Sequence, residues 1–269
     1  MPLKNDQKYF DIMIEPLHVC KNYKPKLGHG GKEGYSLKEF RRFYGTDPFY
    51  KWMGLDTPLM YAAHKAAGGM TSVYRQLGIG CERLFRIILQ DKLLLTEEQS
   101  KWSYKVARPG GKERILSLDG RIALEDIQDA NRRSRVEQWM TKAFSILDID
   151  PKVQKSLAGV VFEVRQGYKS KDSKRQNADI ANAATAYTKG YLPCAAILSL
   201  QIDEDIAVRY TTEKWLLLTG SVNIDDPHES VYAFMKTVVG YDLAEFFDRN
   251  RTSFKRQVTN VLKALLEAE

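Results

Sequence analysis

The chain is poor in the residues that usually build disulfide or zinc frameworks. Its 269 residues include only three cysteines and four histidines. The cysteines are scattered and odd in number, which favours free thiols, and they are Cys20, Cys81 and Cys194. No two histidines have the spacing of zinc ligands, and no His-Glu-x-x-His motif occurs. These absences argue against a disulfide scaffold and against a zinc hydrolase.

Long apolar runs and nucleotide-binding loops are also missing. No stretch approaches the ~18 apolar residues of a membrane span, and the polar start MPLKNDQKYF lacks the features of a signal peptide. Residues 68–80 are rich in glycine but lack the Gly-Lys-Ser/Thr of a phosphate-binding loop. We therefore expect a cytoplasmic protein with no membrane partner and no nucleotide cofactor.

Positive charge is present in excess. The chain has 41 Lys and Arg against 34 Asp and Glu, a net charge of +7. A basic surface attracts polyanions, because phosphate contacts release counterions. Five cations gather between residues 163 and 179, and they are Arg165, Lys169, Lys171, Lys174 and Arg175. Binding to a nucleic-acid backbone is therefore the expectation that the composition supports best.

The stretch ARPGGKE at 107–113 predicts an internal boundary. It separates residues 1–113, expected to be mostly helical, from residues 114–269. In the first region, residues 8–15 predict a short strand. Ser36 with Glu39 predicts a helix N-terminus, and the apolar spacing of 70–91 predicts a helix.

The second region alternates between strand and helix patterns. Asp119–Gly120 predicts a hairpin turn between two short strands within 114–124. The remaining predictions are helices over 125–147, 176–188, 229–239 and 252–266, and strands over 158–168, 194–202 and 214–220. This order predicts an α/β (α+β) fold with a mixed central sheet flanked by helices.

One predicted strand carries an unusual polar face. Glu163 lies between Phe162 and Val164, where a carboxylate is costly unless it has a partner or a task. At period two, Glu163 shares its face with Arg165 and, if the strand continues, with Lys169. The polar stretch then leads into a helix N-terminus, a favourable place for phosphate. A carboxylate for Mg²⁺ beside a cation for the phosphorane suits metal-assisted phosphodiester hydrolysis.

Residues 130–250 resemble the type II restriction endonucleases that have a PD-(D/E)XK nuclease core. The resemblance rests on FEVRQGYKSKDSKRQNADI, on the helix and apolar strand that follow, and on SVYAFMKTVVGYDL. It implies a homodimer that uses Mg²⁺ to cut double-stranded DNA at short symmetric sites. We therefore expect residues 114–269 to be a nuclease core and residues 1–113 to be a DNA-contacting region. The resemblance also implies that Glu163 is the acid of the family's Glu-x-Lys element.

The chain departs from the family pattern at two positions. Arg165 stands where the family has lysine, so Lys169 or Lys171 would supply the amine, or Arg165 would replace it. The second metal-binding acid is also open. Asp119 and Asp172 are preferred, and Asp148 and Asp150 are the alternatives.

DNA contacts are predicted in two places. On the first long helix, Arg75 and Gln76 have side chains that suit guanine and adenine edges. After the polar stretch, the next helix would begin with DNA-contacting residues, namely Ser173, Lys174, Arg175, Gln176 and Asn177. Two other functions stay open from the sequence, a non-catalytic DNA- or RNA-binding protein and a nuclease for RNA or modified DNA.

Overall fold

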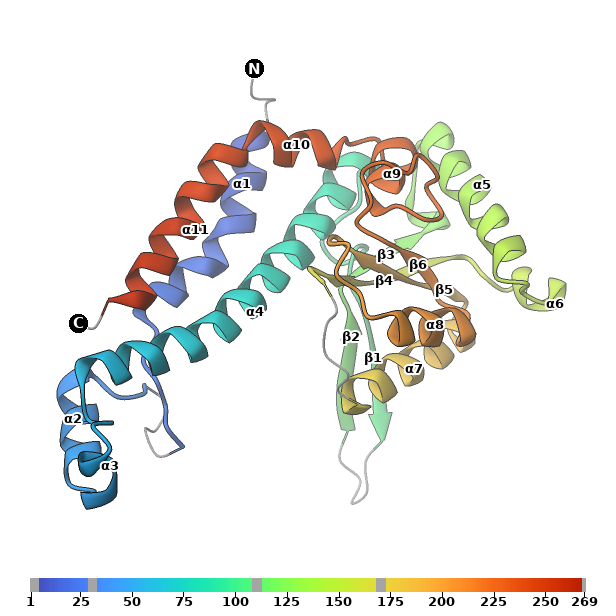
Figure 1. Cartoon of the computed structure of the whole chain (residues 1–269). Coiled ribbons are helices and arrows are strands. Elements are labelled where there is room, and N and C mark those ends of the chain that lie inside the picture. The colour runs from blue at the N-terminus through green and yellow to red at the C-terminus, as the bar shows by residue number, and fades with distance from the viewer. Residues whose placement is uncertain (1–4, 29–32, 108–112, 168–172, 268–269) are drawn as a thin grey trace. The chain divides into compact units, whose positions relative to one another are not determined.

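The computed structural model describes residues 5–28, 33–107, 113–167 and 173–267, with the backbone alone at 107 and 173–180. Its contacts divide the chain into two compact units (Figure 1). The first comprises Met1–Gly80 and Arg249–Glu269, and we call it the helical unit. The second comprises Cys81–Asp248, and we call it the sheet unit. The C-terminal helix therefore belongs with the N-terminal segments rather than with the sheet.

The helical unit is built from short helices around two long ones. Its elements are α1 (Asp6–Ile14), the 3-10 helix η1 (Glu15–Asn22), α2 (Leu37–Gly45), α3 (Pro48–Trp52), the first part of α4 (Pro58–Leu93) and α11 (Arg251–Leu266). The predicted N-terminus at Ser36 is confirmed. The Ser36 hydroxyl accepts the Glu39 N–H, and the Glu39 carboxylate accepts the Ser36 N–H at 2.8 Å.

The strand predicted over residues 8–15 is wrong, because these residues lie in α1. Tyr9 and Met13 are one helical turn apart and both are buried. A short apolar run such as this one fits either period, so the helix was decided by packing partners that local spacing does not reveal. The helix predicted over 70–91 is confirmed but begins earlier, since α4 starts at Pro58.

The core of the helical unit joins the two ends of the chain. Its buried members are Ile14, Leu17, Cys20, Val73, Val261 and Leu265. At Gly80, a Cβ atom would lie 2.4 Å from the Met13 carbonyl oxygen. Only glycine permits this close approach of α4 to the end of α1.

The sheet unit contains a four-stranded sheet in the order β3-β4-β5-β6. Its strands are β3 (Gly120–Ala123), β4 (Gly159–Arg165), β5 (Tyr191–Ile197) and β6 (Leu216–Leu218). The β3–β4 pair is antiparallel, and the β4–β5 and β5–β6 pairs are parallel. Helix α7 (Ser173–Thr188) connects β4 to β5. The predicted mixed sheet flanked by helices is thus confirmed.

The hairpin predicted at Asp119–Gly120 is wrong. β2 (Glu113–Leu118) and β3 run on either side of a bend at Asp119, and β2 forms its hairpin with β1 (Trp102–Ala107) instead. A two-residue hairpin turn of this type needs a positive φ at glycine. Gly120 instead lies in the strand, opposite Phe162 of β4.

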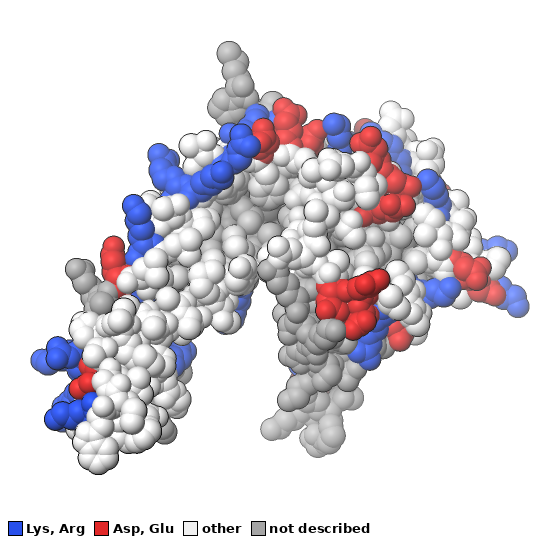
Figure 2. All heavy atoms as spheres, in the orientation of Figure 1, with Lys and Arg blue, Asp and Glu red and all other residues white. Residues whose placement is uncertain are grey.

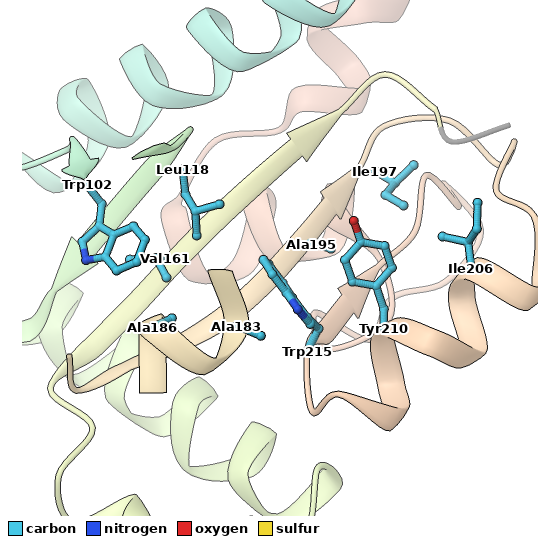
Figure 3. Packing of buried hydrophobic residues seen from close by; sticks show 10 residues of the cluster. All are labelled: Trp102, Leu118, Val161, Ala183, Ala186, Ala195, Ile197, Ile206, Tyr210 and Trp215. Atoms are coloured by element: carbon cyan, nitrogen blue, oxygen red, sulfur yellow. The ribbon is translucent and has the colours of Figure 1, made fainter. Parts of the chain in front are cut away.

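Side chains pack on both faces of β4. On one face, Val161 joins a cluster with Ala183 and Ala186 of α7 and residues of α8 (Glu204–Thr212), drawn in Figure 3. On the other face, the Phe162 ring lies 5.0 Å from that of Phe85. All seven residues of β4 are therefore buried.

The other helices of the sheet unit frame this core. They are α5 (Ala130–Ile146), α6 (Pro151–Gln154), α9 (Val231–Phe234), a π-helix (Met235–Val239) and α10 (Leu243–Arg249), which ends at the unit boundary. Among the described residues, no helix has both the length and the apolar character to cross a membrane. The three cysteines are buried free thiols, as predicted.

Candidate active site

The predicted alternation of β4 brings Glu163 and Arg165 to one face near the carboxyl end of the strand. Both residues are buried, with 8% relative exposure each. Arg165 Nη2 lies 2.5 Å from Glu163 Oε1. Burying either charge alone would cost free energy, and the ion pair compensates part of that cost. Arg165 therefore takes the place next to the acid that lysine holds in the family pattern.

Asp119 comes to the same place from the neighbouring strand. The last paired residues of β3 and β4 are Gly120 and Phe162, so Asp119 lies at the bend just beyond this pair. Two hydrogen bonds hold it there. The Asp119 N–H donates to the Phe162 carbonyl at 2.8 Å, and the Val164 N–H donates to Asp119 Oδ2 at 2.8 Å. The bend that breaks the predicted hairpin thus brings a carboxylate to the β4 backbone at Val164, the residue between Glu163 and Arg165.

A third carboxylate, Glu82 of α4, was not predicted. Burial and, to a smaller extent, the neighbouring Asp119 carboxylate raise the pKa of Glu82 to about 7. Three cations oppose this rise, and they are Arg165, Arg86 and Arg83. Arg86 also donates to the Asp119 carbonyl at 3.3 Å, which ties α4 to the bend. In the sequence, the one local sign of Glu82 is that it is an acid next to the apolar face of a helix whose other charges are mostly basic.

The donor set favours a hard cation. Within the described part of the chain, no three His, Cys, Asp or Glu side chains form a ready metal cage. Mg²⁺ does not need one, because it commonly uses one or two carboxylates together with substrate phosphate and water. Asp119 and Glu163 fit that requirement. Burial first, and the Asp119 carboxylate second, raise the pKa of Glu82, and a divalent cation nearby would lower it.

Thiol chemistry does not fit this site. Cys81 precedes Glu82 on α4, and burial raises the pKa of its thiol to about 12. A thiol in this state stays protonated at neutral pH and is a poor nucleophile or ligand. The chemistry of the site is therefore that of carboxylates and arginines.

Several predicted site residues are not placed here. Lys169, Lys171 and Asp172 lie outside the residues that the structure describes. The predicted DNA-contacting residues lie in the first turns of α7, whose backbone alone is described, and they are Ser173, Lys174, Arg175, Gln176 and Asn177. The helix start predicted after the polar stretch is present, and the roles of these side chains stay predictions.

Other predicted residues lie away from Glu163. Asp148 and Asp150 are exposed and precede the amino end of β4, whereas Glu163 is near its carboxyl end. Asp150 caps α6, accepting the Lys152 N–H at 2.7 Å. Arg75 and Gln76 lie on α4 within the helical unit, Arg75 exposed and Gln76 half-buried. Of the acids considered from the sequence, the structure brings Asp119 to Glu163.

Comparisons with models of protein families, with curated proteins and with solved structures gave no match. The function has to be inferred from the geometry and chemistry of the residues themselves.

Proposed function

We propose that the chain is a Mg²⁺-dependent, site-specific endonuclease that hydrolyses phosphodiester bonds of double-stranded DNA. The observation that carries the proposal is the hydrogen bond from the β4 backbone to the Asp119 carboxylate, next to the Glu163–Arg165 ion pair. The order of β4, α7 and β5 supports the resemblance to the PD-(D/E)XK core. Duplex DNA as substrate and a homodimer as the working form follow from that resemblance.

Each residue of the site has a task in this proposal. Asp119 and Glu163 would hold the Mg²⁺, which when bound polarises the phosphate and lowers the pKa of a bound water. Arg165 positions Glu163 and neutralises part of its charge. Lys169 and Lys171 keep their predicted place facing the scissile phosphate, where an amine would stabilise the charge of the phosphorane.

The test compares cleavage and binding in matched variants. Plasmid and phage DNA are incubated with the protein over a range of Mg²⁺ concentrations and in EDTA. We expect discrete Mg²⁺-dependent fragments, whose sequenced ends reveal the recognition site. In Glu163→Gln and Asp119→Asn, we expect cleavage to fall by at least about 10³-fold, because each removes a charged ligand of the metal.

Asp148→Asn is the matched control, since it changes an exposed acid of the same unit. Its cleavage is expected to equal that of the wild type, and all three variants are expected to retain DNA binding in a gel shift. Full activity of Glu163→Gln would disprove the site. Intact DNA at every Mg²⁺ level, with a salt-sensitive gel shift, would instead establish the alternative, a non-catalytic nucleic-acid-binding protein.

A further inference from the structure

The net charge of the chain is divided unevenly between its two units. Residues 1–80 and 249–269 hold 17 Lys and Arg against nine Asp and Glu, a net charge of +8. Residues 81–248 hold 24 against 25, a net charge of −1. The basic excess that predicts a polyanion partner therefore resides in the helical unit, not in the unit with the candidate active site.

Within the helical unit, α11 has the most one-sided charge. Its 16 residues, RTSFKRQVTNVLKALL, contain no acid. Lys255, Arg256 and Lys263 are exposed, and none of them has an ion-pair partner among the described residues. Figure 2 shows Lys and Arg side chains gathered along this helix. The exposed side also presents uncharged hydrogen-bonding side chains, namely Thr252, Thr259 and Asn260.

The opposite side of α11 is already used by the fold. Val261 and Leu265 are buried in the core of the helical unit, and the Phe254 ring lies 4.7 Å from that of Phe10. An amphipathic helix that enters a membrane surface needs its apolar face available. That face of α11 is covered, so the exposed cations fit a polyanion that is bound by charge rather than by apolar insertion.

The exposed cations also have no role in holding the fold. Arg249, just before α11, shows the contrasting case, because its guanidinium donates to Asp6 at 3.1 Å and 3.2 Å. No comparable contact to a described residue exists for Lys255 or Lys263. Their charges are therefore available to a bound polyanion.

We propose that the exposed face of α11 binds the phosphate backbone of duplex DNA. The proposal rests on the proposed function for its ligand and adds the surface that holds it. Lys255 and Lys263 are eight positions apart, about 12 Å along a helix at about 1.5 Å per residue. That separation matches the roughly 12 Å width of the major groove. Cations at the two ends of the face can therefore reach phosphates on both sides of the groove.

The test measures how the affinity for duplex DNA depends on salt. The variant Lys255→Gln/Arg256→Gln/Lys263→Gln is compared with the wild type by fluorescence anisotropy in EDTA. Each lost phosphate contact lowers the slope of log affinity against log salt by about 0.9, so we expect a decrease of about 2.7. At moderate salt, the affinity is expected to fall by about 10–100-fold.

The matched control removes three exposed lysines of the sheet unit, in Lys152→Gln/Lys155→Gln/Lys189→Gln. Its salt slope is expected to stay within about 0.5 of the wild-type slope. Circular dichroism checks the fold of both variants. If the triple variant of α11 does not fold, the three single variants are measured, with an expected decrease of about 0.9 in each.

The outcomes separate this proposal from the proposed function. At low salt and high protein concentration, the α11 variant is expected to cleave bound DNA at the wild-type rate, because Asp119 and Glu163 are intact. A wild-type salt slope in a variant that still cleaves DNA would overturn the role of α11 alone. Wild-type protein that neither binds nor cuts DNA, yet binds phosphatidylserine vesicles, would overturn both proposals.

Discussion

The two units of the molecule differ in what their charges do. In the helical unit, Lys255, Arg256 and Lys263 of α11 are exposed and have no acidic partner among the described residues. In the sheet unit, Glu163 and Arg165 are buried and paired, and burial, together with the nearby Asp119 carboxylate, raises the pKa of Glu82. Carboxylates that would hold a metal also repel DNA. Under the two proposals, the helical unit would bind the DNA backbone and the sheet unit would carry out the chemistry at the phosphate.

Among the variants that test this difference between the two units, a substitution of Arg165 is expected to have the largest effect. In Arg165→Met, the Glu163 carboxylate remains buried without its partner, which typically costs about 3–5 kcal/mol of stability. We expect cleavage to fall by at least about 10²-fold, because the acid loses both its orientation and its compensating charge. Urea unfolding and single-turnover cleavage measure the two effects.

Arg165→Lys is the control that tests whether Arg165 has only a structural role. It restores the family's Glu-x-Lys pattern and keeps the positive charge, so we expect cleavage within about 10-fold of the wild type. DNA affinity at low salt should be unchanged in both variants if binding belongs to the helical unit. Equal cleavage by Arg165→Met and wild-type protein would contradict the pairing as part of the site.

A smaller effect is expected in the helical unit at Gly80. In Gly80→Ala, the new Cβ would lie 2.4 Å from the Met13 carbonyl oxygen, so α1 and α4 must move apart. Overpacking of this kind usually costs about 1–3 kcal/mol, against a helix-propensity gain of about 1 kcal/mol. We expect a lower free energy of unfolding in urea, with the Glu163–Arg165 pair untouched.

Gly120→Ala is the matched change in the sheet unit. There the added Cβ would meet its nearest side-chain atoms, on Leu89 and Phe85, at 3.5 Å, an ordinary contact. Its stability is expected to change by less than about 1 kcal/mol. If Gly120→Ala were the more destabilising of the two, the close approach of α1 and α4 would not be what stabilises the helical unit.

Features of the site that depend on neighbouring residues in the sequence could be predicted, and features that depend on distant residues could not. Alternation along residues 159–165 predicted the shared face of Glu163 and Arg165, because strand period is local. The cap at Ser36 was predictable for the same reason. Glu82 was not, since its pKa depends on Asp119, 37 positions further along the chain. The turn predicted at Asp119–Gly120 was wrong because Gly120 pairs with Phe162 of β4, so the two residues do not form a hairpin turn.

Long-range packing also decided where α11 belongs. The helix was predicted at nearly its observed bounds but was grouped with the nuclease core by its place in the sequence. Val261 and Leu265 instead pack with Ile14 and Leu17, near the other end of the chain. Helical periodicity reveals which face is apolar and not which partner covers it.

The smallest effect predicted here is a dependence of stability on pH at Glu82. The pKa of Glu82 is about 7 in the folded chain, above the value of 4.5 for a free side chain. As pH rises from about 4.5 to about 7, the unfolded chain loses this proton first, so the free energy of unfolding falls. Glu82→Gln cannot ionise and escapes this loss. We expect it to be more stable than the wild type near pH 8 by about 1–2 kcal/mol, allowing for solvent screening, and nearly equal below about pH 4.5.

Urea unfolding in EDTA near pH 5 and near pH 8 measures the difference without metal. Glu97→Gln is the control, because hydrogen bonding to Lys101 lowers the pKa of that exposed carboxyl. Its contribution changes only below about pH 4.5, so its offset from the wild type should be the same at both pH values. A Glu82→Gln offset that is also constant would mean that burial and the Asp119 carboxylate do not raise the pKa of Glu82 in the folded chain.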